Sequence, residues 1–597
     1  MSTKTTAVHV THEAVGKIGG IGAVLDGLFT SQAYNDAIGR SILVSPLFST
    51  EGDVTTRLGP GGEVLYSSLD GLTRSNYYSS FRRIEEAFNV QIVYGRRTFH
   101  DSRSGVKSTP EVILIDITRI EPGPVNELKS KMFHEFGIRS NLYEHLWEYE
   151  QYVRLAPPAI AVLKAIGAAE RDSSTVIVSH EFMGMPTALA GILDPFDFKT
   201  VFYAHEVAPM RHIVESHTGH DTMFYNVIRQ AHESGLYLNE VFGDQSFNFK
   251  FGLVDAARFC DNILAVGDCV VDELRFMAPE FDLVDIDLTY NGIPAFEIGL
   301  AEKHQSRQRL REYCKNILGY RPDYVFTHVT RLVPSKGLWR DMRVLENLDR
   351  EFQTLGKTAV LFVLSTEIGK RRNRDIYNME AAYNWPVAHR EGLPDLSGGE
   401  AAYYAGVQEF NAKSRNIKIV YINQFGFDRE CCGMRVPYDM EFMDIRKGSD
   451  AEFGQSIYEP FGIAQLEPLS FGGICVVTNV CGCAGFVRAV TGGKDVKNVI
   501  IADYTNIGDE DKFADIEDLK QLDRVARDRI EKKISAKVAL ELAARLPKTD
   551  DETFSMIRQG YDLARHMSWD AVVEKYVAPS LTKALKKLHH NKLSLSA

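Results

Sequence analysis

The sequence predicts an α/β protein with two doubly wound domains, each built on a parallel β-sheet. Three observations predict this class: a length of 597 residues, short apolar runs that alternate with helical patterns, and a charged stretch at 301–316 between two sets of such runs. A chain of this length exceeds what one hydrophobic core usually holds. Strands that alternate with helices are typical of parallel sheets.

The predicted strands are rich in β-branched and apolar residues, and they fall into two sets. In the first half they are 5–12, 41–48, 111–118, 174–182, 199–206, 262–267 and 283–291. In the second half they are 323–332, 359–366, 417–423, 473–479 and 498–504. We therefore expect a Rossmann-like domain over 1–300, a second over 301–565, and a C-terminal helix with a polar tail over 566–597.

Ligands of doubly wound sheets bind beyond the carboxyl ends of the strands. Two such domains facing each other would form one deep interdomain cleft at that place. The segment 368–416 is rich in Arg, Asn and Gly, and we interpret it as an insertion in the second domain.

Composition restricts the partners. The net charge of −12 argues against duplex nucleic acid, although a local basic cleft for phosphates is compatible with it. The sequence contains no apolar run of about 18 residues, so no membrane span is predicted. No secretory signal is recognised either. The eight cysteines lack zinc-site spacing, so no metal is expected. We expect a cytoplasmic protein, and the sequence leaves a homo-oligomer open.

The first chemical motif is the glycine-rich segment Lys17-Ile18-Gly19-Gly20-Ile21-Gly22, between a strand and a helical pattern. Glycines let backbone amides approach a phosphate, and a helix N-terminus adds a positive field. A tight strand-to-helix turn explains the motif equally well. It lacks the third glycine of a dinucleotide fingerprint, which disfavours a nicotinamide-linked dehydrogenase.

The second motif, Arg331 to Gly337, follows a predicted strand and contains Arg331 and Lys336 five residues apart. Arginine binds phosphate oxygens with a fork of N–H groups, and lysine adds a point charge. A solvated surface loop is the alternative. The pattern therefore favours a phosphate-binding loop at the carboxyl end of a strand.

The third motif, 456–467, contains two glutamates, Glu459 and Glu467, in apolar surroundings. Pro460 and Gly462 predict a turn that opens a helix, with Glu459 on the loop and Glu467 in the second helical turn. One carboxylate could bind sugar hydroxyls and the other a ribose. The alternative is a surface helix with ordinary acidic residues.

Six short motifs occur in one order along the chain. They are EAVGKIGG (13–20), His180-Glu181-Phe182, His205 in FYAHEVAPMR, Tyr290-Asn291-Gly292-Ile293, Arg331 with Lys336-Gly337, and Glu459 with Glu467. Together they resemble the retaining glycosyltransferases of the GT-B fold, in particular the glycogen and starch synthases, with similarity to the eukaryotic glycogen synthases. The resemblance implies that the C-terminal helix closes back toward the first domain. Phe182 departs from the tryptophan of the family's motif.

The resemblance also implies roles for individual residues. Arg331, Lys336 and the Gly19–Gly20 amides would neutralise a leaving nucleotide diphosphate, and His180 would contact the donor sugar near its reacting carbon. Glu459 would hold the outer sugar hydroxyls, and Glu467 the ribose. The implied catalytic set is His180, Arg331, Lys336 and Glu459. The implied donor-binding set is Lys17, Gly19, Gly20, His205, Tyr458, Gly462, Ile463 and Glu467.

The function implied is transfer of a hexosyl unit, glucose first, from a nucleotide diphosphate sugar to a carbohydrate acceptor. UDP-glucose and ADP-glucose are the favoured donors, and an α-glucan is one acceptor that the resemblance allows. Neither cofactor nor metal is expected. Asp285-Ile286-Asp287 mimics the DxD of metal-dependent transferases, but it lies in a predicted strand, so we interpret it as a coincidence.

Other functions stay open. A nucleotide-sugar epimerase would bind the same donor without an acceptor, and a small-sugar glycosyltransferase would differ only in its acceptor. A phosphorylase would need a pyridoxal-binding lysine, which we do not identify. A catalytically silent carbohydrate-binding regulator would bind nucleotide without turnover, although the presence of Arg331, Lys336 and both glutamates argues against it.

Overall fold

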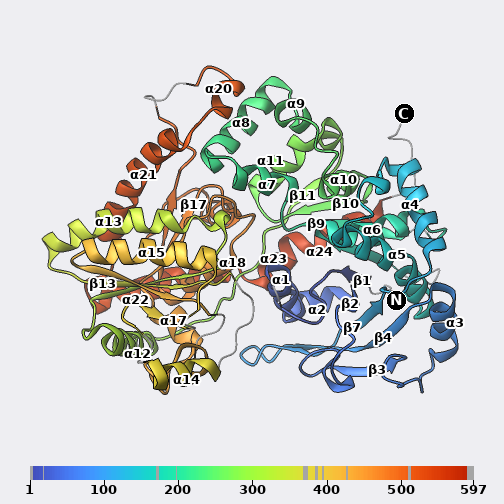
Figure 1. Cartoon of the computed structure of the whole chain (residues 1–597), viewed down its shortest axis with the longest axis horizontal. Helices are drawn as coiled ribbons and strands as arrows, with labels where there is room; N and C mark the ends of the chain where they lie inside the picture. The colour runs from blue at the N-terminus through green and yellow to red at the C-terminus, as the bar shows by residue number, and fades with distance from the viewer. Residues whose placement is uncertain are drawn as a thin grey trace. The chain divides into compact units, whose positions relative to one another are not determined.

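The computed structural model describes residues 5–17, 19–169, 174–196, 198–367, 374–383, 387–392, 395–424, 428–508 and 513–587 (Figure 1). The chain divides into two compact units. Unit 1 comprises Met1–Met210, Ala231–Gly292 and Trp569–Ala597, and unit 2 comprises Arg211–Gln230 and Ile293–Ser568. Among the described residues, no helix is both long and apolar enough to cross a membrane.

Unit 1 contains a nine-stranded sheet in the order β11-β10-β9-β8-β1-β2-β7-β4-β3. Its strands are β1 (Thr5–Val10), β2 (Ile38–Pro46), β3 (Glu63–Ser67), β4 (Gln91–Arg96), β7 (Glu111–Asp116), β8 (Thr175–His180), β9 (Lys199–Ala204), β10 (Asn262–Ala265) and β11 (Ile286–Leu288). Its helices are α1 (Gly20–Phe29), α2 (Gln32–Ala37), α3 (Tyr78–Phe88), α4 (Pro122–Phe136), α5 (Trp147–Ala165), α6 (Glu181–Leu193), α9 (Leu238–Phe242), α10 (Phe249–Asp255), α11 (Asp268–Met277), α23 (Trp569–Val572) and α24 (Ala578–Lys586).

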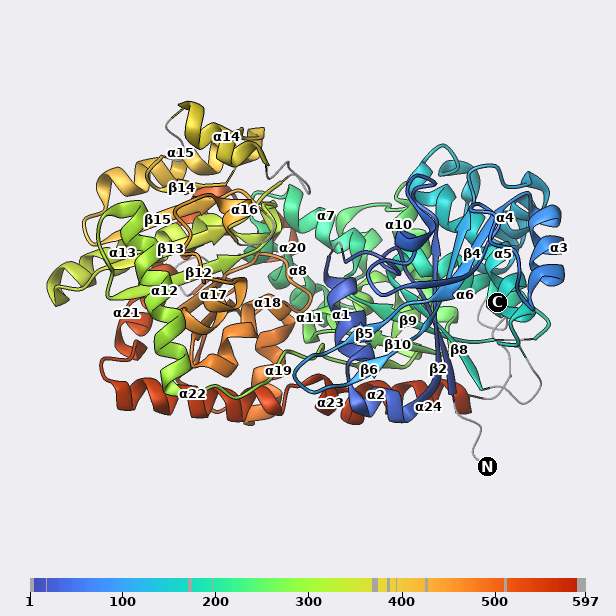
Figure 2. The same ribbon diagram turned by 90° about the horizontal axis from the view of Figure 1, so that it is seen from below.

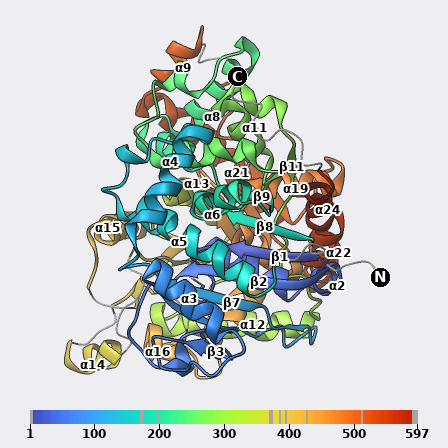
Figure 3. The same cartoon turned by 90° about the vertical axis from the view of Figure 1, so that its right-hand side faces the viewer.

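Helices cover both faces of this sheet. Figure 3 shows α5 and α6 on one side of the strands and α2 and α24 on the other. The C-terminal α24 lies alongside β9 and β10 (Figure 2). There, Lys583 Nζ binds Asp287 Oδ1 at 2.8 Å, and Asn262 Nδ2 donates to the Ser580 carbonyl at 3.2 Å. The C-terminal helix therefore belongs to unit 1.

One edge of the unit 1 sheet was not predicted. β3 and β4 pair antiparallel, and so do β4 and β7. The link from β4 to β7 contains only the two-stranded hairpin of β5 (Phe99–His100) and β6 (Lys107–Ser108). Because a parallel pair requires a long crossover connection, such a link reverses the chain direction. The sheet is thus parallel in its centre and antiparallel at one edge.

Unit 2 contains a seven-stranded, fully parallel sheet in the order β14-β15-β13-β12-β16-β17-β18. Its strands are β12 (Tyr324–Val329), β13 (Ala359–Leu364), β14 (Arg390–Glu391), β15 (Ile417–Ile422), β16 (Ala451–Gly454), β17 (Ile474–Thr478) and β18 (Val499–Ala502). Its helices are α12 (Leu300–Leu318), α13 (Leu338–Leu355), α14 (Arg374–Tyr383), α15 (Gly398–Lys413), α16 (Arg429–Cys432), α17 (Phe442–Gly448), α18 (Ile463–Leu466), α19 (Gly482–Thr491), α20 (Ile516–Lys520), α21 (Arg524–Arg545) and α22 (Asp550–Arg565). The prediction of two α/β units with parallel strands is confirmed.

The boundaries differ from the expected ones in two places. The change from unit 1 to unit 2 lies at Gly292–Ile293 rather than at 300, since Ile298 already packs with Phe471 and Ile557 in the unit 2 core. The second difference is the segment Arg211–Gln230, which belongs to unit 2 although the chain around it belongs to unit 1. It includes parts of α7 (Ala208–Ser216) and α8 (His220–Ser234).

The interpretation of 368–416 as an insertion falls partly on residues 368–373, 384–386 and 393–394, which lie outside the described residues. In its described part, β14 pairs with β15 at the sheet edge, and α15 packs on β15. This part therefore contributes to the sheet of unit 2.

Candidate functional site

Four of the six predicted motifs occur at the same topological position in the two sheets. In unit 1, β1 and β8 are neighbours from which the chain winds in opposite directions; in unit 2 the corresponding pair is β12 and β16. Such switch points are where doubly wound sheets bind ligands, beyond the carboxyl ends of the strands. The glycine-rich motif follows β1 and His180 ends β8; Lys336 follows β12 and Glu459 follows β16.

In unit 1, the glycine-rich motif is organised by a buried carboxylate. Glu13 Oε2 accepts hydrogen bonds from the amides of Gly19 at 2.7 Å and Gly22 at 3.0 Å. A Cβ at position 22 would lie 2.5 Å from this oxygen and 3.0 Å from the Cα of Lys17, so a larger residue there would displace the Glu13 carboxylate. Lys17 and Gly20 are exposed. The Gly19 amide, predicted for a phosphate, thus binds Glu13 here, and Lys17 and Gly20 are the part of the motif that faces solvent.

Three histidines and a tyrosine form a polar chain in unit 1. His9 Nε2 lies 2.7 Å from Tyr34 Oη, His9 Nδ1 lies 2.9 Å from His180 Nε2, and His180 Nδ1 lies 2.8 Å from His205 Nε2. His180 is fully buried, whereas His205 is partly exposed. Burial lowers the pKa of His9 and of His205 to about 3, and it also lowers that of His180. The three rings are therefore neutral at pH 7.

Strand register explains why these rings meet. His9 pairs with Val178 across β1 and β8, and His180 pairs with Tyr203 across β8 and β9. Residues two apart in a strand share a face. His180 is two residues beyond Val178, and His205 is two residues beyond Tyr203. Each ring of the polar chain therefore lies closer to the carboxyl edge of the sheet than the ring before it. Sequence reasoning missed His9 and Tyr34, because neither belongs to a recognised motif.

The residue after His180 has an unusual backbone. Glu181 begins α6 with φ +59, a left-handed conformation that is uncommon for a residue other than glycine. It is 3% exposed, and its Oε1 accepts a hydrogen bond from the Glu206 amide at 2.6 Å. This bond ties the start of α6 to the residue after His205. Such strain is concentrated at functional sites.

In unit 2, Lys336 and Glu459 form an ion pair. They are 123 residues apart, and Lys336 Nζ lies 2.5 Å from Glu459 Oε2. Both side chains are largely buried, with exposed fractions of 12% and 14%. Gln465 Nε2 also donates to Glu459 Oε2 at 3.2 Å, which fixes the carboxylate from a second side.

Two close backbone contacts bring the pair together. The Ser335 carbonyl accepts hydrogen bonds from the amides of Ile457 at 2.8 Å and Tyr458 at 3.2 Å. Gly337 has φ +60, and a side chain there would lie 2.4 Å from the Gln455 carbonyl oxygen. Because only glycine fits, the sequence Lys336-Gly337 lets the two loops touch.

The remaining predicted residues lie close to this pair in the chain. Arg331 is exposed, and within the described residues its guanidinium has no hydrogen-bond or ion-pair partner. Tyr458 is buried with the Arg211 guanidinium 5.4 Å from its ring centre. Gly462 has φ +93 and directly precedes α18, whose first residue, Ile463, is partly exposed.

Glu467 differs from its predicted setting. α18 ends at Leu466, and Glu467 begins a 3₁₀ helix, Glu467–Phe471, whose second residue, Pro468, has no N–H with which to continue the α-helical hydrogen bonds. The Glu467 carboxylate binds Arg446 at 2.6 Å. Arg446 is fully buried and also binds Glu452 at 2.9 Å. Glu467 is thus held by a buried guanidinium while its side chain stays 28% exposed.

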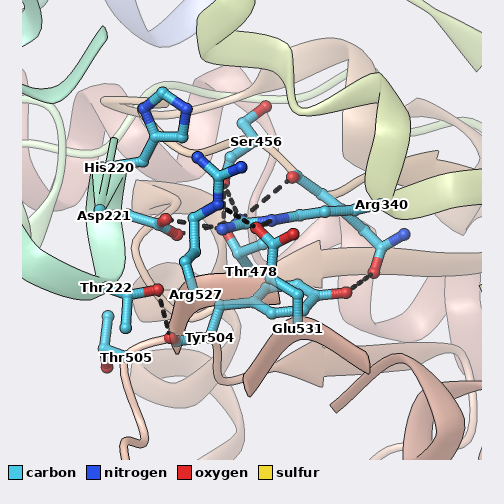
Figure 4. Close-up of polar contacts among 12 residues, drawn as sticks. His220, Asp221, Thr222, Arg340, Ser456, Thr478, Tyr504, Thr505, Arg527 and Glu531 are labelled. Carbon is cyan, nitrogen blue, oxygen red and sulfur yellow. Dashed lines mark hydrogen bonds and ion pairs between the residues drawn. The ribbon is translucent and has the colours of Figure 1, made fainter. Parts of the chain in front are cut away.

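A fully buried arginine, Arg340, follows the Lys336 loop in the chain (Figure 4). Arg340, in the first turn of α13, binds Asp221 through two bonds of 2.9 and 2.6 Å and Glu531 through one of 2.9 Å. Its guanidinium lies 3.9 Å from the ring centre of Tyr504. All three charged side chains are completely excluded from solvent. Asp221 belongs to the segment 211–230, so this cluster binds that segment to unit 2.

The Arg340 cluster also contacts the loop that carries Glu459. Arg340 Nη1 lies 3.4 Å from the carbonyl oxygens of Gln455 and Ser456. Tyr504 Oη donates to Gln455 Oε1 at 2.6 Å, and Ser456 Oγ lies 3.4 Å from Glu459 Oε2. The cluster therefore supports both loops of the Lys336–Glu459 pair.

Asp285 and Asp287, which mimic the DxD metal motif, have side-chain partners within unit 1. Asp287 accepts hydrogen bonds from Lys583 and from Asn262 Nδ2, the latter at 2.7 Å, and Asp285 lies 3.4 Å from Lys583 Nζ. Within the part of the chain that the structure describes, no group of three His, Cys, Asp or Glu side chains could hold a metal ion.

Comparison with known proteins gave similarity of fold only. No family model and no curated protein matched the chain. Among solved structures, the N-terminal domain of a Candida albicans trehalose-6-phosphate phosphatase is 10% identical, with a TM-score of 0.51 over 97% of both chains. At this identity the likeness concerns the fold alone, and with the two sheets it confirms the predicted α/β fold of the GT-B type.

Two further structures cover 98% of this chain and 100% of their own, each with a TM-score of 0.49. One, from E. coli, is described as trehalose-6-phosphate bound with UDP-2-fluoro glucose and is 11% identical. The other is the catalytic domain of starch synthase IV from Arabidopsis thaliana bound to ADP and acarbose, and is 14% identical.

Proposed function

We propose that the protein is a retaining glycosyltransferase that moves a hexosyl unit, glucose first, from a nucleotide diphosphate sugar to a carbohydrate acceptor. The observation that carries this proposal is the meeting of Lys336 and Glu459 at 2.5 Å between two loops at the switch point of unit 2. A nucleotide sugar has phosphates, which a cation binds, and hydroxyls, which a carboxylate binds. Lys336 and Glu459 offer these two groups at one switch point. The proposal extends the resemblance of six motifs to known glycosyltransferases.

The leaving group sets the main chemical demand. When the anomeric carbon separates from the diphosphate, negative charge grows on the phosphate oxygens. Lys336 and the exposed Arg331 are the cations that we assign to this charge. Such preorganised charges act strongly where water is excluded, and the low exposure of Lys336 meets that condition.

Glu459 and Glu467 have different tasks in this proposal. Glu459 would exchange its bond to Lys336 for sugar hydroxyls while Gln465 keeps the carboxylate in place. Glu467, bound on one side by Arg446, would accept the ribose hydroxyls with its partly exposed side. Neither is assigned as a nucleophile. The acceptor oxygen bonds to the anomeric carbon as the diphosphate leaves from the same face, and the acceptor proton passes to the leaving diphosphate oxygen.

A panel of donors and acceptors tests the function. UDP-, ADP- and GDP-glucose are added singly in thermal-shift assays, where a ligand at 100 times its dissociation constant stabilises by about 2.7 kcal/mol. Binding donors are then incubated with maltooligosaccharides, glucose and glucose-6-phosphate, and products are analysed by NMR. We expect an α-linked product from an α-linked donor. A β-linked product would contradict retention, an acceptor-free product would indicate an epimerase, and binding without turnover would indicate a silent regulator.

A further inference from the structure

The hydrogen bonds of the chain Tyr34–His9–His180–His205 must all run in one direction. A neutral imidazole carries one N–H and one lone pair, so each ring donates on one side and accepts on the other. Each contact needs a single hydrogen between its two atoms. Once the tyrosine contact is set, the tautomer of every ring along the chain follows.

Two arrangements satisfy this rule. In the first, Tyr34 donates to His9 Nε2, His9 Nδ1 donates to His180 Nε2, and His180 Nδ1 donates to His205 Nε2. His205 then carries its hydrogen on Nδ1. In the second arrangement all bonds are reversed, so His205 carries its hydrogen on Nε2 and Tyr34 must donate to another oxygen.

The surroundings of Tyr34 select the first arrangement. In the second, the Tyr34 hydroxyl would donate to Ser41 Oγ, which is 3.4 Å away, whereas His9 Nε2 is at 2.7 Å. An O–H···O bond normally measures 2.5–3.0 Å, so the Ser41 contact is a poor one. Tyr34 is 1% exposed, so water does not offer a substitute.

The arrangement also decides which histidine faces a ligand. Both ring nitrogens of His180 are used within the chain, and the ring is fully buried. His205 ends the chain, is partly exposed, and its Nδ1 has no hydrogen-bond partner among the described residues. His205 directly follows β9, at the carboxyl edge of the sheet and next to the switch-point strand β8.

We infer that Tyr34, acting through His9 and His180, holds His205 in the Nδ1–H tautomer, and that this N–H donates to an oxygen of the hexosyl unit. Tyr34, His9 and His180 are then positioning residues, and His205 is the ring that touches the substrate. The inference rests on the proposed function for its ligand, but the tautomer itself is independent of it.

Histidine-labelled protein tests the tautomer directly. The ¹⁵N shifts of the His205 ring, assigned with a His205→Phe variant, distinguish Nδ1–H from Nε2–H. We expect Nδ1–H alone in the wild type. Tyr34→Phe retains the ring but removes the selecting hydroxyl, so both tautomers should be present in similar amounts. Ser41→Ala, the matched control, removes the other oxygen near Tyr34 and should leave Nδ1–H alone.

Binding tests the contact with the sugar. His205→Phe should weaken binding of the nucleotide sugar identified in the donor panel by about two- to tenfold, the loss typical of one neutral hydrogen bond. Tyr34→Phe should weaken it by about twofold, since half the molecules would carry the competent tautomer. The free nucleoside diphosphate, which lacks the sugar, should bind all variants alike and reports intact folding.

The outcomes separate the inference from the proposed function. A wild-type His205 with Nε2–H, or with mixed tautomers, overturns the inference whether or not the protein transfers sugar. A tautomer that stays unchanged in Tyr34→Phe also overturns it. If the tautomers behave as expected but His205→Phe binds the nucleotide sugar normally, the contact with the sugar is wrong. If no nucleotide sugar binds the wild type at all, the proposed function fails and the sugar contact with it.

Discussion

The two units bury polar groups beneath their predicted motifs in opposite ways. Unit 1 uses three neutral histidines, whose chain contains no charge at pH 7 because burial lowers the pKa of His9 and His205 to about 3. Unit 2 uses full charges, with Arg340 between the carboxylates of Asp221 and Glu531. Burial alone would raise the pKa of Glu531, but Arg340, Arg343 and Arg527 lower it below its ordinary value.

The difference predicts different sensitivities. Replacing one ring of the neutral chain leaves its neighbours without a hydrogen-bond partner, at about 1–3 kcal/mol for each buried group. Protonation also disrupts the chain, because a second N–H on a ring has no acceptor. A charged cluster tolerates changes of pH around neutrality, but loss of one member leaves the others buried without compensation. We therefore expect the histidine chain of unit 1 to be sensitive to acid, and the Arg340 cluster of unit 2 to be sensitive to substitution.

Arg340 should be the most sensitive position. Arg340→Met removes the ion-pair partner of the buried Asp221 and leaves Glu531 with only Arg343 at 3.1 Å and Arg527 at 3.8 Å. Breaking such a buried pair typically costs about 3–5 kcal/mol. The shift of the urea midpoint, followed by tryptophan fluorescence, measures the loss. Arg524→Ala, on the same helix as Glu531 but with its side chain 77% exposed, is the control and should shift the midpoint very little. Equal shifts in both variants would contradict the importance of the buried cluster.

Substitutions of Lys336 and of Glu459 should differ in their effect on binding of the nucleoside diphosphate. Lys336→Ala removes a charge for the leaving diphosphate, so turnover should fall about 100- to 1000-fold, the effect of losing one preorganised electrostatic contact. It should also weaken binding of the nucleoside diphosphate. Glu459→Gln should slow turnover strongly while leaving that binding almost unchanged, because the ligand has no sugar. Near-normal turnover in both variants would remove the assignment of these residues.

Much of this architecture could be predicted from the sequence, because β-branched runs between helices indicate parallel strands regardless of distant contacts. β12, β13, β15 and β17 all lie within the predicted ranges. The antiparallel pair β3 and β4 at one edge of the unit 1 sheet was missed, and so was β16, which has only four residues, Ala451–Gly454. Short strands contain too little pattern to be recognised by periodicity alone.

The site residues were predicted only where they belong to a local motif. Lys336-Gly337 and Glu459 follow strands in short segments that a reader of the sequence can recognise. Arg340 could not be found in that way, because its partners are 119 and 191 residues away. His9 and Tyr34 depend on strand register and on the packing of α2, which no local pattern contains. The roles of the motif residues stay predictions.

Acid should destabilise unit 1 through its histidines. Their pKa lies near the ordinary 6.5 in the unfolded chain and is lowered in the fold, so the unfolded state binds protons first as the pH falls. The stabilisation is complete above pH 6.5 and declines toward pH 3 by about 1.4 kcal/mol per pH unit for each of His9 and His205. Urea unfolding at several pH values measures the slope, which should be shallower in His9→Phe. An identical slope in that variant would argue against buried neutral histidines.

The smallest effect is expected at Asp285 and Asp287, although they resemble a metal motif. Asp287 is bound by Lys583 and Asn262 and holds the C-terminal helix, so its carboxylate has a structural partner already. Lys583 is 42% exposed, and exposed ion pairs typically contribute about 0.2–1 kcal/mol, so Asp287→Asn should lower stability only slightly.

We also expect turnover of the variant to stay close to that of the wild type, and turnover of both to persist in excess EDTA, because Lys336 and Arg331 are assigned to the leaving diphosphate. Assays with EDTA, and with Mg²⁺ or Mn²⁺ added back, decide this. Loss of activity that a metal restores in the wild type but not in Asp287→Asn would make this aspartate a metal ligand and remove the two cations from their proposed role.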